Sequence, residues 1–229
     1  MTKALTIRFM KGGHADEREV AIAPVIVAGW TGRDEAAVRK HVKELEELGV
    51  RAPSATPVFY RVSSQRLTTS KSIEVVGEHS SGEVEFVLLQ SGGELWVGLG
   101  SDHTDRAVEA YDVAISKEVC EKPIAAAFWS FAEVEKHWDQ LTLRSFIVED
   151  NKRVPYQECA VTTMLAPRVL IERFVGYPDL PEGALMYCGT SPAIGGIRPA
   201  PEFQGELHDP VLGRTIAFRY AIHTLPQVS

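Results

Sequence analysis

Short apolar stretches rich in β-branched and aromatic residues recur along most of this chain, separated by glycine, proline and polar residues. Stretches of this length and composition are typical of β-strands. They outnumber the helical patterns and do not alternate regularly with them, which disfavours a doubly wound parallel sheet. We therefore expect a strand-dominated α+β fold. The predicted strands are residues 4–10, 24–30, 58–62, 73–76, 84–89, 95–99, 110–116, 142–149, 184–188 and 216–221.

Three segments have the apolar spacing of helices instead, namely residues 34–48, 131–141 and 164–174. Thr31 followed by Asp34 is a capping signal for the first of these helices, and Gly49 is its expected end. Four residues would form its apolar face: Val38, Val42, Leu45 and Leu48.

Composition narrows the class of protein. The 229 residues are 45% hydrophobic and 24% charged, which is sufficient for a substantial core. The formal net charge of −7 disfavours binding to nucleic acid or to an anionic membrane, because both need a basic surface. The three cysteines form no CxxC pair and disfavour a disulfide scaffold. We expect a cytoplasmic protein, because the sequence has no signal-peptide core and no membrane-spanning run of roughly 20 apolar residues.

Two glutamates, Glu83 and Glu85, lie two positions apart at the start of the predicted strand 84–89. Side chains at this spacing point to the same side of a strand, and Val84 and Phe86 point to the other. Neighbouring carboxylates repel each other unless a cation lies between them, and a hard divalent cation with oxygen ligands meets that need. From this segment alone, an edge strand with a solvated acidic face is the alternative.

A third carboxylate, Asp102, follows the glycine-rich end of the predicted strand 95–99. It could be a further metal ligand, or it could cap a turn. Farther along, Gly189 and Thr190 follow the predicted strand 184–188. Exposed backbone amides in such a turn can bind a carboxylate or an oxyanion.

His41 and Glu44 lie three positions apart on the predicted helix 34–48, so they are neighbours on its surface. A carboxylate beside an imidazole orients the ring and raises its basicity, as a general base requires. A half-buried histidine with an incidental neighbour is the alternative.

From about residue 25 to its end, the chain resembles the motif series of the fumarylacetoacetate hydrolase superfamily. His41-Val42-Lys43-Glu44 is similar to the family's His-x-x-Glu segment, and Glu83-Val84-Glu85 to its metal-binding strand. Lys122 falls near the position of its active-site lysine. Three longer segments resemble its Pro-x-x-Phe-x-Lys segment, its metal-binding turn and its late glycine-threonine loop: Pro57–Arg61, Gly98–Arg106 and Leu180–Pro192. Ser101 and Arg61 replace the family's asparagine and lysine, which indicates a divergent bacterial branch.

The resemblance implies a mixed β-roll with a small N-terminal α/β segment, and a homodimer. It implies that Glu83, Glu85 and Asp102 bind Mg2+ or Mn2+. It assigns catalytic roles to His41, Glu44 and Lys122, the first two by positioning or deprotonating a water. The implied contacts to a small acidic substrate are Arg61, Arg106, Gly189 and Thr190.

The function implied by the resemblance is that of a metal-dependent hydrolase or lyase in catabolism. Its substrate would be a small 2-oxo or 1,3-dicarbonyl carboxylic acid, with C–C bond hydrolysis through a metal-bound enolate-like intermediate as the expected reaction. Hydrolysis of a C–N bond and an inactive ligand-binding module are the alternatives on the same fold. A winged-helix DNA-binding regulator is disfavoured, because the helix at 34–48 is acidic and no helix precedes it in the predicted order.

Pro53 and Pro57 mark a connection between two parts of the chain. We expect residues 1–56 to form N-terminal strands and the helix that carries His41 and Glu44. Residues 57–229 would form the catalytic domain, with the two parts packed as one unit.

Overall fold

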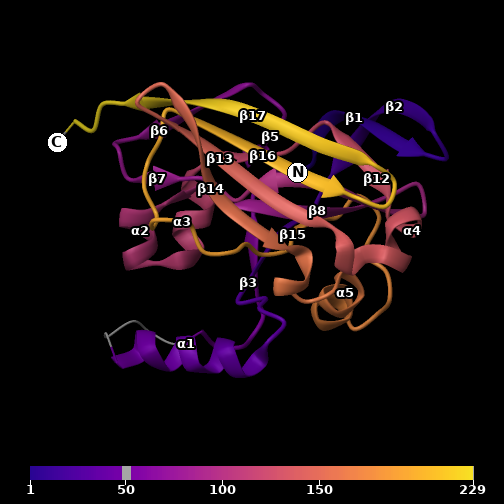
Figure 1. Ribbon diagram of the computed structural model, residues 1–229, viewed down its shortest axis with the longest axis horizontal. Helices are drawn as coiled ribbons and strands as arrows, with labels where there is room; N and C mark the ends of the chain where they lie inside the picture. Colours follow the sequence, from indigo (N-terminus) through magenta and orange to yellow (C-terminus); the bar gives the residue numbers. More distant parts are fainter. Residues whose placement is uncertain (48–52, 229) are drawn as a thin grey trace.

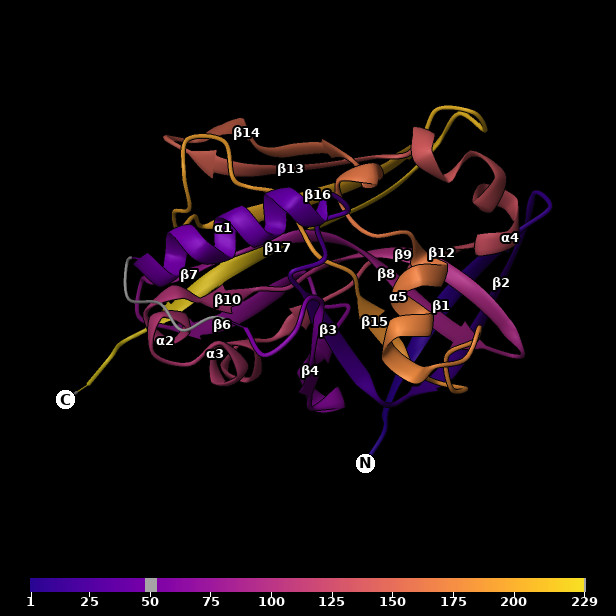
Figure 2. The same cartoon turned by 90° about the horizontal axis from the view of Figure 1, so that it is seen from below.

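The computed structural model describes residues 1–47 and 53–228, without the side chains of residues 41 and 44–47. Over these ranges two sheets pack against each other, and helices lie around their edges (Figure 1). Strands dominate, as predicted. Turned by 90°, the molecule shows the smaller sheet lying across the larger one (Figure 2).

The larger sheet has eight strands in the order β2-β1-β12-β9-β8-β15-β3-β4. Their bounds are β1 Lys3–Lys11, β2 His14–Ile22, β3 Val25–Gly29, β4 Val58–Val62, β8 Val84–Ser91, β9 Glu94–Ser101, β12 Ala127–Ser130 and β15 Leu185–Tyr187. The pairs β1–β12 and β15–β3 are parallel and the others antiparallel. Strand β8 is central, so the alternative of an acidic edge strand is wrong.

The smaller sheet has five strands in the order β14-β13-β16-β17-β6, and only β17–β6 is parallel. Their bounds are β6 Ser72–Val76, β13 Thr142–Glu149, β14 Lys152–Ala160, β16 Glu202–Asp209 and β17 Arg214–Leu225. Two short pairs complete the strands: β5 Leu67–Thr68 with β11 Lys122–Pro123, and β7 Ser80–Ser81 with β10 Thr104–Asp105.

The helices are short apart from α1 and α5. The α-helices are α1 Glu35–Glu47, α2 Arg106–Tyr111, α3 Val113–Val119, α4 Phe131–Val134 and α5 Pro167–Val175. The 3₁₀ segments are η1 Ser64–Arg66, η2 Glu135–Gln140 and η3 Val161–Thr163. No helix in the described ranges is long and apolar enough to cross a membrane.

Strand β8 is buried on both faces because it contributes to two hydrophobic clusters. Val84, Phe86 and Leu88 point into the core between the two sheets, together with Phe203 of β16. Val87, on the opposite face with its neighbour Leu89, packs in a second cluster. Glu85 is on this second face, so its carboxylate lies inside the protein and not in solvent.

The predicted strand at 110–116 is wrong, because α2 and α3 cover this region. Asp105 accepts hydrogen bonds from the amides of Ala107 (2.9 Å) and Val108 (3.0 Å), and Asp112 accepts one from the amide of Ile115 (2.9 Å). Each aspartate is the N-cap of a short helix, and capping decided the conformation over the apolar content of the segment.

Two predicted helices are shorter than expected. The segment 131–141 is one turn of α-helix followed by η2, with a kink at His137. The segment 164–174 becomes helical only from Pro167, the first helical position. Proline favours that position because its missing N–H would have no helical partner there.

Helix α1 stands apart from the two sheets (Figure 1). Asp34 caps it by accepting hydrogen bonds from the amides of Ala36 (2.9 Å) and Ala37 (3.1 Å), so the N-cap is Asp34 itself. An ion pair of 3.1 Å joins Glu35 to Arg173 of α5. The predicted end at Gly49 lies outside the described residues. Strands β1 to β3 precede α1, so it lacks the preceding helix of a helix-turn-helix.

Candidate metal centre

The carboxylates of Glu83, Glu85 and Asp102 come together where β8 begins and β9 ends. The two strands are antiparallel, with Val84 opposite Ser101. The ladder continues one step further, since the amide of Asp102 donates to the carbonyl of Glu83 over 3.0 Å. One ligand oxygen from each of the three residues lies within 4.8 Å of the others. The sequence predicted this group, and we call it the carboxylate triad.

Burial makes negative charge on Glu85 and Asp102 unfavourable. Glu85 is 2% exposed and Asp102 is 1% exposed, so water solvates neither carboxylate well. Burial raises the pKa of Glu85 well above its usual range, and the charges of Asp102 and Glu83 raise it further. The triad therefore needs positive charge nearby.

Lys122 supplies part of that charge. Its fully buried ammonium lies 3.0 Å from Oδ1 of Asp102 and donates to the carbonyl of His103 over 2.6 Å. Arg106 supplies another part, with Nη2 3.0 Å from Oε1 of Glu83 and Nη1 2.7 Å from Oε2 of Glu109. Both residues were predicted site residues, and both contact the triad.

A second lysine, Lys117, also reaches the triad, and the sequence analysis missed it. Its Nζ lies 2.8 Å from Oδ2 of Asp102, 3.4 Å from Oε2 of Glu83 and 3.3 Å from Oε1 of Glu109. It also donates to the hydroxyl of Thr104 over 3.1 Å. The wrong strand at 110–116 hid this lysine, whereas recognition of the two aspartate caps would have placed it on α3.

The two lysines act on the same carboxylate. Burial alone would raise the pKa of Asp102, but the ammonium groups of Lys117 and Lys122 lower it to about 2. Burial opposes the charge on Lys117, but Asp102, Glu83 and Glu109 raise its pKa well above the usual range. Asp102 is thus ionised and Lys117 protonated at neutral pH.

Gly189 and Thr190 contact β8 directly. The amide of Gly189 donates to Oε2 of Glu85 over 2.6 Å, and the hydroxyl of Thr190 donates to the carbonyl of Val84 over 2.7 Å. Gly189 has a φ of 96°, and a Cβ on it would lie 1.8 Å from Oγ1 of Thr31. Only glycine fits this turn without a shift of the backbone.

Gln157 of β14 fixes this turn and was not predicted as a site residue. Its Nε2 donates to the hydroxyl of Thr190 (2.7 Å) and to the carbonyl of Ser191 (2.6 Å). Its Oε1 accepts from the amide of Val84 (2.9 Å) and from the hydroxyl of Ser145 (3.0 Å). A polar residue on a strand gives no sequence signal for a contact of this kind.

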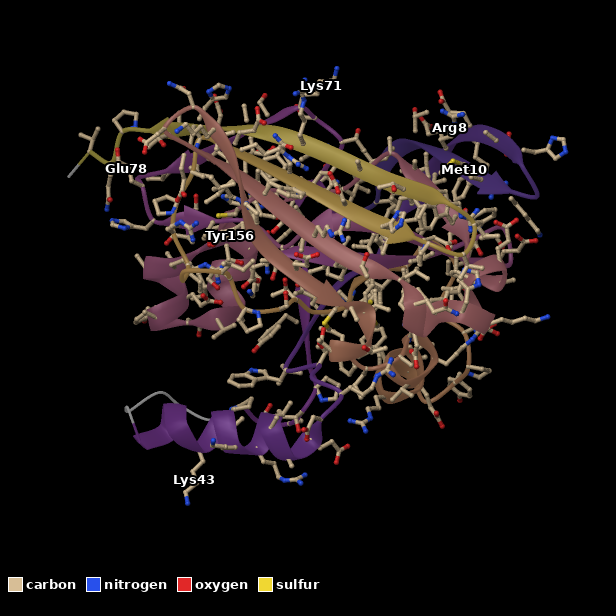
Figure 3. The ribbon with its side chains drawn as sticks, viewed as in Figure 1. Arg8, Met10, Lys43, Lys71, Glu78 and Tyr156 are labelled. Carbon is tan, nitrogen blue, oxygen red and sulfur yellow. The ribbon has the colours of Figure 1, made fainter. Side chains whose placement is uncertain are left out.

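Three predicted residues are not brought to the triad by any described contact. The side chains of His41 and Glu44 lie outside the described part of the structure, although both positions belong to α1. The labelled Lys43 of the same helix points away from the body of the molecule (Figure 3). Arg61 of β4 is exposed, whereas the preceding Tyr60 is half-buried. Burial raises the pKa of Tyr60, and the nearby charges of Lys117 and Glu109 also act on it, Lys117 lowering it and Glu109 raising it.

A cavity of about 310 Å3 adjoins the site on the side of Arg106. Ser81, Arg198 and Pro199 also line it, and the hydroxyl of Ser81 accepts a hydrogen bond from Nε of Arg106 over 2.7 Å. Arg106 therefore lies between the triad and a space large enough for a small molecule. Glu78, which also lines the cavity, is labelled in Figure 3.

The triad fits a hard divalent cation. All its donors are carboxylate oxygens, which Mg2+ and Mn2+ prefer. Oδ1 of Asp102 is buried and accepts no well-aligned hydrogen bond from the described residues, although the Lys122 ammonium lies close to it. Such an oxygen retains a lone pair for a metal.

Solved structures share this fold. The crystal structure of Cg1458 superimposes with a TM-score of 0.64 at 14% identity, covering 93% of this chain and 85% of that chain. A hexagonal crystal form of 2-keto-3-deoxyarabinonate dehydratase gives a TM-score of 0.65 at 14% identity, covering 95% and 86%. 2-Keto-3-deoxy-D-arabinonate dehydratase complexed with magnesium and 2,5-dioxopentanoate gives a TM-score of 0.64 at 15% identity, covering 93% of this chain and 78% of that chain. The predicted fumarylacetoacetate hydrolase-like roll is thereby confirmed.

Sequence comparison adds the family. No curated protein matches the chain. A family model does match, over residues 28–220, and its description is "Protein of unknown function (DUF2848)". This range includes the triad, both lysines, Arg106, the Gly189–Thr190 turn and Gln157. The chain belongs to the DUF2848 family.

Proposed function

We propose that this protein is a metal-dependent hydrolase or lyase of the fumarylacetoacetate hydrolase type, acting on a small 2-oxo or 1,3-dicarbonyl carboxylic acid. The observation that carries the proposal is the carboxylate triad, in which Glu85 and Asp102 are buried and one ligand oxygen from each residue lies within 4.8 Å of the others. Two lysines and an arginine lie beside it. Hydrolysis of a C–C bond beside a carbonyl is the proposed reaction.

Glu83, Glu85 and Asp102 would hold Mg2+ or Mn2+, and the bound ion would polarise a substrate carbonyl as a Lewis acid. Arg106 lines the cavity of about 310 Å3 and would bind the substrate carboxylate there. Lys122 would stabilise negative charge that develops on the substrate oxygen. Gly189 and Thr190 would keep Glu85 oriented and border the substrate, and Arg61 would contact its distal end.

His41 and Glu44 would supply the base. The carboxylate of Glu44 would orient the imidazole of His41, which would then take a proton from the attacking water. This step requires α1 to bring His41 to the substrate, and α1 stands apart from the two sheets (Figure 1).

Dehydration of a 2-keto acid is the second candidate reaction. The dehydratase structures are the observation that favours it, since one of them contains magnesium and 2,5-dioxopentanoate. Elimination would use the same carbonyl polarisation but would need no water nucleophile. A screen of 2-keto-3-deoxy sugar acids beside 1,3-dicarbonyl acids separates the two reactions by their products.

Thermal unfolding with and without Mg2+ or Mn2+ tests the metal site. Metal at about 100 times Kd should stabilise the wild type by roughly 2.7 kcal/mol, and the variant E83A/E85A should show no such shift. The matched control is E17A/E19A, which removes two exposed glutamates at the same spacing from β2. If the wild type shows no metal-dependent shift, the metal-enzyme proposal is wrong.

The proposal includes a homodimer in the cytoplasm, as the resemblance implies. Sedimentation equilibrium of the purified chain measures the oligomeric state, and cell fractionation measures the localisation. A monomer at micromolar concentration would contradict the dimer without affecting the metal site.

A further inference from the structure

Lys117 occupies an unusual position for a lysine, because it lies among the carboxylates that would bind the metal. Its side chain is 8% exposed, and its Nζ lies within 3.4 Å of oxygens from Asp102, Glu83 and Glu109. Lys122, which the family resemblance accounts for, contacts only Asp102 within the triad. Lys117 is thus an additional cation at this site.

Cationic groups already lie beside the oxygens of two members of the triad, Asp102 and Glu83. Asp102 has Lys122 at Oδ1 (3.0 Å) and Lys117 at Oδ2 (2.8 Å). Glu83 has Arg106 at Oε1 (3.0 Å) and Lys117 at Oε2 (3.4 Å). A dication bound to both residues would share oxygens with the Lys117 ammonium, and charges of the same sign a few ångströms apart repel strongly in a buried site.

Glu109 is an alternative ion-pair partner for the Lys117 ammonium. It belongs to α2, its Oε1 lies 3.3 Å from Nζ of Lys117, and its side chain is 27% exposed at the outer edge of the cluster. A lysine side chain is a flexible four-carbon stem with rotatable bonds, so its ammonium can move toward Glu109 without a change of the backbone. Glu109 is outside the triad and has no predicted role.

On these contacts we propose that Lys117 is an internal counter-cation, which holds Glu83 and Asp102 together and must withdraw toward Glu109 before a divalent metal binds tightly. This inference rests on the proposed metal site and deepens it, because it names the residue that sets the affinity for the metal. Lys117 is a positioning residue here, and it performs no chemical step.

The test is the metal affinity of Lys117→Met, measured calorimetrically with Mg2+ and with Mn2+ on the whole chain. Without the ammonium, Kd for the metal should fall at least about tenfold, because the ion no longer competes with a positive charge. Lys152→Met is the control, since Lys152 is exposed at the start of β14 and its loss changes only the net charge.

A double variant tests whether the effect of Lys117 comes from its position or from a change in local charge. It also provides a variant that is expected to fold. Lys117→Met leaves Asp102 and Glu83 with one cationic partner fewer, which can destabilise the fold. Lys117→Met with Glu109→Gln removes one charge of each sign, so the local formal charge stays that of the wild type. It should fold, and it should still bind metal at least about tenfold more tightly. Glu109→Gln alone should weaken binding in the wild type but have little effect beside Lys117→Met, a coupling that a double-mutant cycle measures.

Each outcome decides the matter. Binding of the metal by the wild type, with tighter binding by both Lys117 variants, supports the inference. If the wild type binds metal and the folded double variant binds it no more tightly, the proposed role of Lys117 as a counter-cation is wrong and the proposed function stands. If neither the wild type nor the Lys117 variants bind metal, both proposals are wrong.

Discussion

Buried carboxylates in this protein fall into two kinds, which single residues illustrate. Asp209 is fully buried at the end of β16, and both of its carboxylate oxygens have partners from the protein. Its Oδ1 accepts from the amides of Val211 (3.0 Å) and Leu212 (3.1 Å) and lies 3.0 Å from Nε2 of His137, and its Oδ2 lies 3.2 Å from Nε of Arg214. Asp102, by contrast, retains an oxygen without a well-aligned donor among the described residues. Asp209 is therefore a structural carboxylate and Asp102 a candidate ligand.

Asp209→Asn should lower the free energy of unfolding by about 2 kcal/mol at pH 7, because hydrogen bonds to a charged group are among the stronger ones. Burial alone would raise the pKa of Asp209, but the amide of Leu212 and the neighbouring His137 and Arg214 lower it. Such a group stabilises the fold above its unfolded pKa of about 3.9 and loses that contribution as the pH falls. Urea unfolding should show the difference between wild type and variant narrow from pH 6 to pH 3.5. An undiminished difference at pH 3.5 would contradict this assignment.

At the scale of elements, the turn after β15 joins Glu85 of the carboxylate triad to the smaller sheet. Gly189 contacts Glu85, Thr190 contacts Val84, and Gln157 of β14 contacts Thr190. The turn thus depends on both sheets, although it is only a few residues long. Its backbone conformation is what directs the amide of Gly189 at Glu85.

Gly189→Ala should abolish metal-dependent stabilisation and lower stability by about 2–3 kcal/mol, since the new methyl group overlaps Thr31 and the turn must move. The matched control is Gly196→Ala. Gly196 has a similar φ of 90°, but a Cβ there meets nothing within 4 Å, so only backbone strain is added. Thermal unfolding with and without Mg2+ distinguishes the two variants. Equal metal-dependent shifts in both would show that the Gly189 turn does not orient Glu85.

At the scale of the whole molecule, the N-terminal strands are part of the larger sheet. Strand β3 lies between β15 and β4, and β1 pairs with β12. Ile26 of β3 belongs to the core between the sheets, and Phe9 of β1 to the second cluster. The predicted division at residue 56 separates segments of sequence that share one sheet.

A fragment of residues 57–229 should therefore fail to unfold cooperatively, because β12 would lose its neighbour β1, β15 would lose its neighbour β3, and the core would lose its N-terminal side chains. A chain that ends at Leu225 is the control, since residues 226–228 are exposed. Near-ultraviolet circular dichroism during a urea titration measures the transition. A sharp transition in the fragment would show that residues 57–229 are an independent domain.

The sequence by itself determined most strands and the triad, because both depend on local pattern. Alternation placed Glu83 and Glu85 on one side of β8, and the glycine-rich strand end placed Asp102 beside them. Where local signals competed, the sequence misled: the caps Asp105 and Asp112 made helices of a segment with apolar residues typical of a strand.

Only the tertiary structure decided the surroundings of the triad. Lys117 of α3 contacts the triad directly, Glu109 of α2 contacts Lys117, and Gln157 of β14 holds the Gly189–Thr190 turn. No spacing along the chain shows that these elements converge. It also decided that Tyr60 is half-buried and Arg61 exposed, because the pairing of β3 with β4 sets which face of β4 turns inward. Periodicity is a property of neighbouring residues, whereas a buried charge selects partners by distance in space, wherever the chain brings them.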